Sequence, residues 1–215
     1  MNVNCLDGTP AEAQAWDRYV AQSSQATSDH LWGWRRVLSE AFGFCPHYLG
    51  AQEGERLVGI LPLFVIPRGF GRSAISSIPF GNYGGICADS PEVAEILLQK
   101  AKDLSHRLRC DYLELRHRTP LPDSTLNPQD LHSRFVFPLN GDSQDHFRKL
   151  GTAHRTKIRK ATQMGLQVVS SPDVGSLYPV HLHTAQRHGT PCFPRRYFDL
   201  ILREFYDKVQ IHLSF

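Results

Sequence analysis

Residues 57–89, LVGILPLFVIPRGFGRSAISSIPFGNYGGICAD, decide the fold of this 215-residue chain. The continuous apolar run over residues 57–66 predicts a strand that is buried on both faces. Residues 73–79 are again strand-like, and the Arg-Gly-Phe-Gly of residues 68–71 between the two runs predicts a hairpin turn. The glycine-rich exit FGNYGG, residues 80–85, permits turn geometry that other residues resist. The stretch therefore predicts the centre of a mixed sheet, followed by a turn whose backbone approaches another segment or a ligand closely.

Helix signals stand on both sides of this stretch. Thr9, Pro10 and Glu12 form a capping box that predicts a helix as far as about Gln22. The remaining elements predicted for the first part of the chain are a helix at 29–41, a strand at 47–52 with a turn at 53–55, a helix at 92–108, a strand at 111–116, a loop at 119–129 and a strand at 132–139.

In the second part of the chain, predicted helices again precede predicted strands. Helices are predicted at 143–150, from Thr152 or His154 to Gly165, at 174–188 and at 194–206, and strands at 166–171 and 209–215. Gly189 is predicted to cap the third of these helices and Pro191 to prevent its continuation.

Composition indicates a globular protein of ordinary kind. The chain is 41% hydrophobic and 21% charged, and no apolar run approaches the ~20 residues that span a bilayer. The N-terminus lacks the basic region and apolar core of a secretory signal. The five cysteines are scattered, without a CxxC pair, which predicts reduced thiols and a cytoplasmic location. No metal-binding spacing is present, so no metal is expected.

Positive charge is concentrated in one block. Residues 148–160 contain six Lys and Arg and no acid, whereas the rest of the chain has 18 Lys and Arg against 21 Asp and Glu. Within the block, Arg155 and Arg159 are four residues apart and share a helix face, flanked by Lys157 and Lys160. Ile158 is expected to face inward. Such a face suits phosphates through bidentate arginines, and the alternative is a solvated cationic face.

Four segments resemble the FemAB-like transferases, relatives of the Fem aminoacyl transferases that are built from acetyltransferase-like (GNAT) domains. They are LVGILPLF at 57–64, SSIPFGNYGG at 76–85, HRTKIRKATQMGL at 154–166 and RHGTPCFPRRYFDLILREF at 187–205. The pattern is particularly similar to the FemAB-like proteins of bacterial exopolysaccharide and exosortase systems. The landmarks occur in the family's order and cover nearly the whole chain.

The resemblance implies an α/β (α+β) fold with a GNAT-like mixed sheet flanked by helices at 1–141, then the beginning of a second GNAT-like domain at 142–215. It implies that the chain stops inside that domain, leaving an apolar strand at 209–215 with an unpaired edge. It also implies an acyl or aminoacyl transferase that forms an amide on an amine-bearing precursor of the cell envelope or exopolysaccharide. The donor would be acyl-CoA or aminoacyl-tRNA. The acceptor would be an anionic small molecule or lipid-linked precursor.

The residues expected to bind the acceptor are Arg155, Lys157, Arg159, Lys160, Tyr83 and Thr190, and no catalytic base is assigned. In this family the first domain generally lacks a working acyl-CoA site. The turn at 68–73 nearly fits the Q/R-x-x-G-x-G/A pattern that holds a pyrophosphate, but it leads into a strand rather than a helix. The chain by itself is therefore expected to be inactive.

Three alternatives remain open from the residues. The chain is a catalytically inert binding or interaction module, a small-molecule N-acetyltransferase, or an RNA-binding protein. RNA binding needs aromatic residues beside the cations, and none lies between Arg148 and Leu166. No DNA partner is expected.

Overall fold

The computed structural model describes residues 1–118, 121, 126–129, 135–138, 140–170 and 173–214. The chain forms two compact units, which are described separately below. Residues 1–122 and 193–207 form the first unit, and residues 123–192 and 208–215 form the second. These units follow spatial contacts, whereas the predicted domains 1–141 and 142–215 follow the order of the chain, and their boundary stays a prediction.

The first unit begins with the helices that its capping signals predict. Helix α1 (Pro10–Gln22) starts at a capping box in which the Thr9 hydroxyl accepts from the Glu12 N–H and the Glu12 carboxylate accepts from the Thr9 N–H. A 3-10 turn at Ser28–His30 and helix α2 (Trp34–Phe42) take the place of the second predicted helix. Helix α2 ends at Gly43, whose left-handed φ of 72° suits glycine.

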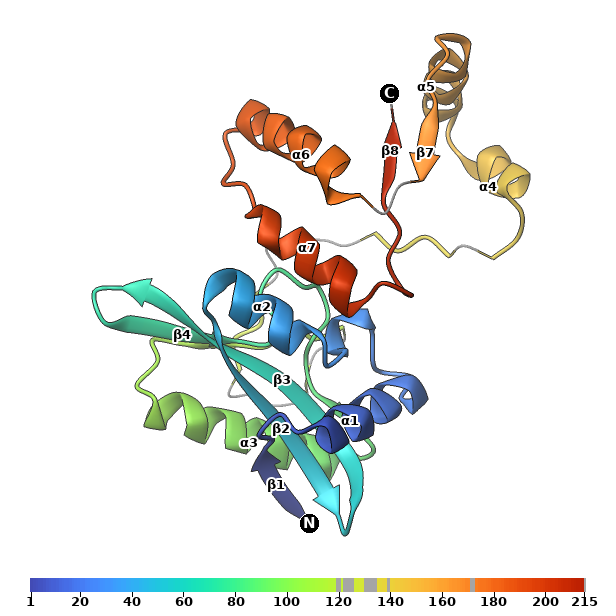
Figure 1. Ribbon diagram of the computed structural model, residues 1–215. Coiled ribbons are helices and arrows are strands. Elements are labelled where there is room, and N and C mark those ends of the chain that lie inside the picture. The colour runs from blue at the N-terminus through green and yellow to red at the C-terminus, as the bar shows by residue number, and fades with distance from the viewer. Residues whose placement is uncertain (119–120, 122–125, 130–134, 139, 171–172, 215) are drawn as a thin grey trace. The chain divides into compact units, whose positions relative to one another are not determined.

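A mixed sheet forms the middle of the first unit (Figure 1). Strands β2 (Cys45–Glu53), β3 (Arg56–Gly69) and β4 (Arg72–Ser76) follow one another as antiparallel neighbours, and β6 (Leu113–Glu114) runs parallel to β4. Strand β1 (Asn2–Cys5) pairs with β2, and β5 (Cys87–Ala88) pairs with β3. The two predicted central strands are thus confirmed, although β4 ends at Ser76 rather than at residue 79.

Residues 57–66 of strand β3 are apolar without interruption because helices cover both sides of the sheet. On one face, Gly59 lies against Val93 and Leu97 of α3 (Pro91–Arg107). On the other face, Tyr48 contacts Phe64 and also Trp16 of α1, with the ring centroids of Tyr48 and Trp16 4.8 Å apart. A strand between two helical layers has no wet face, which explains the continuous run.

The second unit contains α4 (Ser143–Lys149), α5 (Thr152–Gln163), α6 (Val174–His188) and a two-stranded antiparallel sheet of β7 (Val168–Ser170) and β8 (His212–Ser214). The expectation of a lone strand at 209–215 is therefore wrong: residues 212–214 pair with β7. The predicted strand at 132–139 is also wrong for Phe135–Pro138, which form no strand, and its other residues lie outside the described part of the chain.

Helix α7 (Arg195–Glu204) follows α6 in the chain but packs in the first unit, against α2. Its Tyr197 and the adjacent Phe205 contact Trp34, and Gly33 lies so close to the Phe205 ring that a Cβ there would be 2.7 Å away. The order strand, helix, helix, strand thus occurs twice: β1-α1-α2-β2 and β7-α6-α7-β8, each with its two strands antiparallel.

Within the described ranges, no helix has the length and apolar character needed to cross a bilayer. Those ranges also contain no group of three or more His, Cys, Asp or Glu side chains placed to hold a metal ion.

Candidate functional site

The parallel pairing of β4 with β6 ends at Ser76 and Glu114, and the Ser77 N–H still donates to the Glu114 carbonyl at 2.9 Å. The Arg116 N–H then donates to the Ser77 hydroxyl at 2.8 Å instead of to a backbone carbonyl, so the regular ladder stops here and leaves a gap in the pairing. A gap between parallel strands exposes backbone donors and acceptors, so it is a place where the fold can hold a ligand.

Side chains from the same strands fill this gap. Glu114 accepts hydrogen bonds from the Ser76 hydroxyl at 3.2 Å and from Arg116 Nε at 2.9 Å, and Arg116 Nη1 donates to the Gly81 carbonyl at 2.6 Å. Glu114 and Arg116 thus form an ion pair within this segment. The gap is therefore closed by a polar network, and the glycine-rich loop is tied to it through Gly81.

The loop at residues 77–85 is fixed by contacts from the α1–α2 connection. The Asp29 carboxylate accepts from the backbone N–H groups of Asn82 and Tyr83 at 2.6 and 2.8 Å, and the Thr27 hydroxyl donates to the Tyr83 carbonyl at 3.0 Å. The expected close approach of backbone to another segment is found here, and that segment is part of the chain. Tyr83, which the sequence predicts to contact substrate, is half-buried at this place.

Two residues of the loop have backbone angles unfavourable to non-glycine residues. Ile78 and Phe80 have φ of 54° and 67°, a region that β-branched and bulky residues rarely adopt. Ile78 is buried, with 1% exposure, and Gly84 leaves room for it, whereas Phe80 is 48% exposed. Phe80 contacts Phe42, Phe44 and Phe193. The loop thus presents an aromatic side chain at the surface from a strained, well-anchored backbone.

Two histidines lie behind the loop. His30 is buried and its Nε2 is 2.9 Å from the Gly85 carbonyl oxygen and 3.2 Å from Cys87 Sγ. His117 Nε2 accepts from the Ile86 N–H at 3.4 Å. Burial lowers the pKa of His30, and burial together with the nearby His30 lowers the pKa of His117 to about 4. Burial also raises the pKa of the Cys87 thiol to about 12. The cluster is therefore neutral at pH 7, and its thiol is protonated and not a nucleophile.

The helix that follows the loop is unsuited to binding an anion at its N-terminus. The Ser90 hydroxyl caps α3 by accepting from the Val93 N–H, so one of the free donors is already used. Asp89 precedes the cap, and Glu92 lies in the first turn with its pKa lowered by a hydrogen bond from Ser90. The Glu92 carboxylate repels a pyrophosphate from the place where helix N–H groups normally attract it, whereas the Asp89 carboxylate is paired with Arg56.

The turn at Arg68–Ser73 joins β3 to β4 as a hairpin, as predicted. It leads into a strand, so no helix N-terminus follows it. The resemblance to a pyrophosphate-binding pattern therefore has no matching structure at this turn.

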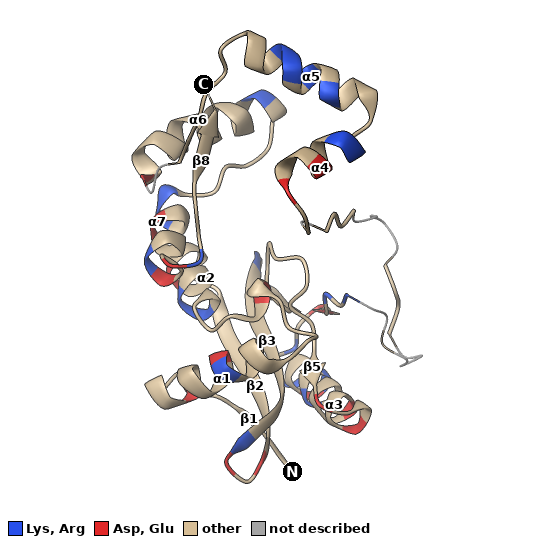
Figure 2. Ribbon diagram, turned by 90° about the vertical axis from the view of Figure 1, so that its right-hand side faces the viewer, with Lys and Arg blue, Asp and Glu red and all other residues tan. Residues whose placement is uncertain are grey.

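Helix α5 contains four of the six cations of the acid-free block and is seen as blue and tan ribbon without red in Figure 2; the other two, Arg148 and Lys149, end α4. Arg155 and Arg159 both turn toward α4. Arg155 donates to the Arg148 carbonyl and to the Thr152 hydroxyl, each at 3.3 Å, and the Arg159 guanidinium lies 5.6 Å from the centre of the Phe147 ring. The shared face predicted for these two arginines is the one that packs on α4.

The two lysines of the block that lie on α5 make fewer contacts than the arginines. Lys157 and Lys160 are exposed and make no ion pair with another described residue. Ile158, expected to face inward, is 44% exposed, so that expectation is wrong. Arg155 uses two of its five N–H donors locally, so the remaining donors of Arg155 and the two lysines are available to an anion.

Thr190 follows the C-terminus of α6 and is exposed. Gly189, at φ 64°, ends the helix, and the Thr190 N–H donates to the Ala185 carbonyl at 3.0 Å. The predicted cap is confirmed. Tyr83 belongs to the first unit, and Thr190 and the four cations belong to the second.

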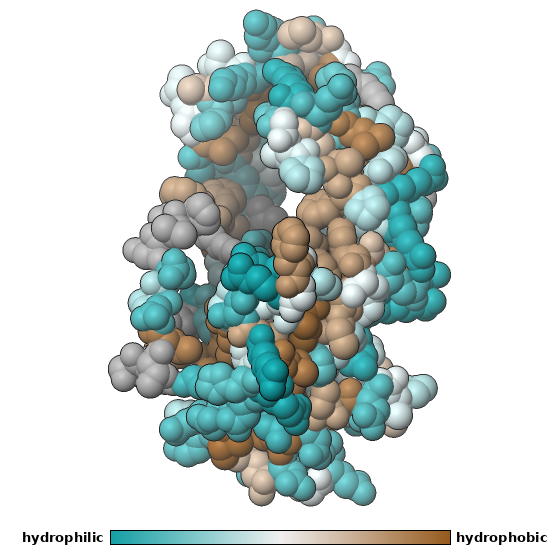
Figure 3. Space-filling view, turned by 90° about the vertical axis from the view of Figure 1, so that its left-hand side faces the viewer, coloured by the Kyte–Doolittle hydropathy of each residue, from teal (hydrophilic) through white to brown (hydrophobic). Residues whose placement is uncertain are grey.

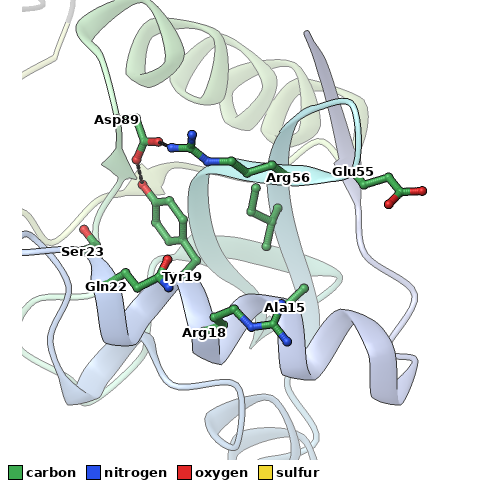
Figure 4. A pocket seen from close by; sticks show the side chains of 9 residues that line it. Ala15, Arg18, Tyr19, Gln22, Ser23, Glu55, Arg56 and Asp89 are labelled. Carbon is green, nitrogen blue, oxygen red and sulfur yellow. Dashed lines mark hydrogen bonds and ion pairs between the residues drawn. The ribbon is translucent and has the colours of Figure 1, made fainter.

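A pocket of about 440 Å³ lies between α1 and the start of β3 (Figure 4). Tyr19 reaches from α1 to donate to Asp89 at 3.0 Å, and Arg56 pairs with the same carboxylate. Burial and the hydrogen bond to Asp89 raise the pKa of Tyr19, so it stays a neutral donor. Arg18 lines the pocket without a hydrogen bond or ion pair to another described residue. Leu57 and Glu55 also line the pocket, so Arg18 shares it with two carboxylates, those of Asp89 and Glu55.

Sequence reasoning missed this pocket because its residues come from three separate segments with no motif. None of the residues predicted for acceptor binding lines it.

No family model matches this sequence, and no curated protein matches it either. Among solved structures, the chain resembles the crystal structure of FemX with a TM-score of 0.67 and 14% identity, covering 100% of this chain and 57% of the FemX chain. A ribosomal-protein-alanine N-acetyltransferase from Brucella melitensis biovar Abortus 2308 gives a TM-score of 0.45 and 17% identity, covering 64% of this chain and 99% of its own. The expected fold class is confirmed: an α/β protein with a GNAT-like mixed sheet flanked by helices. The chain spans a little over half the length of FemX.

Proposed function

We propose that the chain is part of a FemAB-like acyl or aminoacyl transferase. The observation that carries the proposal is the fold itself, a mixed sheet flanked by helices that matches FemX along the whole of this chain with a TM-score of 0.67. Amide formation in such a fold requires that a neutral acceptor amine be oriented toward an activated ester or thioester and that backbone donors stabilise the oxyanion.

The first unit does not supply the donor site in this proposal. Its strand gap is filled by Arg116 and Glu114, and the N-terminus of α3 has Asp89 and Glu92 beside it. A pyrophosphate-bearing donor would have to displace Arg116 and Glu114 from the strand gap. It would also have to approach the carboxylates of Asp89 and Glu92. The donor, acyl-CoA or aminoacyl-tRNA, is therefore assigned to the second GNAT-like domain. The chain by itself is proposed to have no turnover.

The acceptor is proposed to be an amine-bearing precursor of the cell envelope or exopolysaccharide, linked to a phosphate or sugar and used in the cytoplasm. Its anionic part would be bound by Arg155, Lys157, Arg159 and Lys160, and other parts by Tyr83 and Thr190. Support comes from the free donors of Arg155 and from the two lysines that lack a described acidic partner.

The second candidate function is a binding module without catalysis. The filled strand gap of the first unit favours it, because that unit retains the fold while its cofactor position is closed. A small-molecule N-acetyltransferase requires a working donor site, and the first unit offers no anchor for one. One aromatic contact supports RNA binding, because Phe147 lies beside Arg159. A single ring, however, is a poor surface for stacking bases.

Calorimetry on the 215-residue chain tests the proposed acceptor site. A sugar linked to uridine diphosphate should bind, and the double variant R155A/R159A should bind it at least tenfold more weakly, because each hydrogen bond to a charged group contributes about 1.5–3 kcal/mol. The matched control is Arg195→Ala, which should bind like the wild type. Arg195 lies on α7 and pairs with Asp199. Unchanged affinity in R155A/R159A would mean that the face is merely solvated.

Acetyl-CoA is the second titrant. Stoichiometric micromolar binding would show that the first unit has a working donor site, and the assignment of the donor to the second domain would be wrong.

A further inference from the structure

The hairpin between β3 and β4 carries a phenylalanine that nothing in the described chain covers. Phe70, at the tip, is 105% exposed, and Gly69, Phe70 and Gly71 all have positive φ, of 81°, 51° and 72°. Glycine adopts this conformation freely, whereas a bulky side chain is strained in it. Phe70 therefore costs stability twice, through its backbone and through its exposed ring, and contributes no packing in return. A residue placed in this way points to a role in binding rather than in folding.

Arginines surround this tip. Arg68 and Arg72 flank it and both pair with Asp111, at 3.2 and 3.1 Å. Arg68 also lies over the ring of Tyr112, with 5.2 Å from its Cζ to the ring centre, and Tyr112 is itself 47% exposed. The segment that contains Asp111 is attached to the start of β4, because the Asp111 N–H donates to the Ser73 carbonyl at 2.8 Å.

The C-terminus of α3 adds two more arginines at this end of the first unit. Arg109 directly precedes the segment bound to β4, and Cys110 lies beside Ser73 with 3.3 Å between sulfur and oxygen. Burial lowers the pKa of His47, near the start of β2, and the charges of Arg107 and Arg35 lower it further. Neither Arg107 nor Arg109 has an ion pair with another described residue.

We name this surface the hairpin end and define it as Arg68, Phe70, Arg72, Arg107, Arg109 and Tyr112. In Figure 1 the β3–β4 hairpin extends past the helices, with one end of α3 on the same side. Figure 3 views the protein from that side and shows apolar side chains at the surface among hydrophilic ones. Four arginines against one aspartate, around exposed aromatic rings, match the chemistry of an anionic lipid surface: the rings enter the interface and the guanidinium groups contact the headgroups.

We propose that the hairpin end attaches the protein peripherally to membranes containing anionic lipid. Phe70 inserts between headgroups, Tyr112 lies at the interface, and Arg107 and Arg109 bind lipid phosphates. Arg68 and Arg72 keep Asp111 neutralised, so that it does not repel the surface. The proposal is independent of the transferase function, because none of these residues belongs to the strand gap, the glycine-rich loop or α5.

The test is co-sedimentation with vesicles of equal parts phosphatidylglycerol and phosphatidylcholine. The wild type should bind these vesicles. It should bind much more weakly to vesicles of phosphatidylcholine alone. F70S should weaken binding about tenfold, the factor expected when roughly half of a phenylalanine side chain is buried. R107Q/R109Q should weaken it about 25-fold, since each arginine near an anionic surface contributes about fivefold. F70W should retain binding, and its tryptophan emission should shift to shorter wavelength on the vesicles.

Matched controls are Tyr206→Ser and Arg195→Gln, which remove an exposed aromatic and an exposed arginine elsewhere on the same unit. Both should bind like the wild type. Equal binding of F70S and wild type would overturn the proposal, and so would vesicle binding that depends only on Arg155 and Arg159. Self-association that F70S abolishes, without any vesicle binding, would also overturn it and would assign the tip to contact with a second copy.

Discussion

Replacing Gly84 with alanine should destabilise the first unit by about 3 kcal/mol, the upper end of the usual cost of overpacking. A Cβ at this position would lie 2.0 Å from Ile78 Cγ2 and 2.6 Å from Ile78 Cβ, whereas carbon atoms in contact are about 3.5–4.0 Å apart. Ile78 is buried and held in a left-handed conformation, so it cannot yield without displacing the loop. The melting temperature should fall by about 6–12 °C.

Urea unfolding followed by tryptophan fluorescence measures this change in the first unit alone, because the three tryptophans, Trp16, Trp32 and Trp34, all belong to it. Gly151→Ala is the control: the nearest atom to its Cβ is 3.9 Å away, in the second unit. The double variant with Ile78→Ala should cost at least about 1 kcal/mol less than the sum of the single variants. A G84A protein within about 1 kcal/mol of the wild type would refute the packing described for this loop.

Three further outcomes are expected. Arg116→Ala should destabilise the first unit by about 2–3 kcal/mol in the same assay, since it removes a charged hydrogen bond to the Gly81 carbonyl. Arg72→Ala breaks an exposed ion pair and should cost less than about 1 kcal/mol. Equal effects of the two variants would contradict the role given to the bond between Arg116 and Gly81. Because the pKa of His117 is lowered to about 4 in the folded chain, the unfolded chain binds the proton first, and stability should fall by up to about 2 kcal/mol between pH 7 and pH 5; a His117→Asn variant should lose much of this slope. Cys87 should react with a thiol reagent only on unfolding, whereas exposed Cys45 should react at once; prompt modification of Cys87 would show that the cluster behind the loop is open.

The elements with local signals in the chain were predictable within a residue or two. Thr9 and Glu12 start α1, and Gly43 and Gly189 end α2 and α6, because each signal acts on its own turn. Strand β1 was missed, since Asn-Val-Asn-Cys lacks an apolar pattern and is a strand only because β2 pairs with it.

The candidate sites were predictable only in part. Helical spacing correctly placed Arg155 and Arg159 on one face, but it does not show that α4 packs on that face. The glycine motif predicted a tight loop at Tyr83, and nothing near it in the chain indicates that Asp29 anchors it. Contacts between residues far apart in sequence decide these features, so a motif reveals the residue and not its surroundings.

The position of α7 has a consequence for synthesis on the ribosome. The first unit is completed by residues 193–207, about 70 residues after residue 122 has been made, which is a delay of roughly 4–14 s at about 5–20 residues per second. During that interval Trp34 and the backbone at Gly33 lack the Tyr197 and Phe205 rings that later cover them. During this period the nascent first unit therefore has an uncovered aromatic face at the start of α2, which a ribosome-associated chaperone or the same helix of a neighbouring nascent chain can cover.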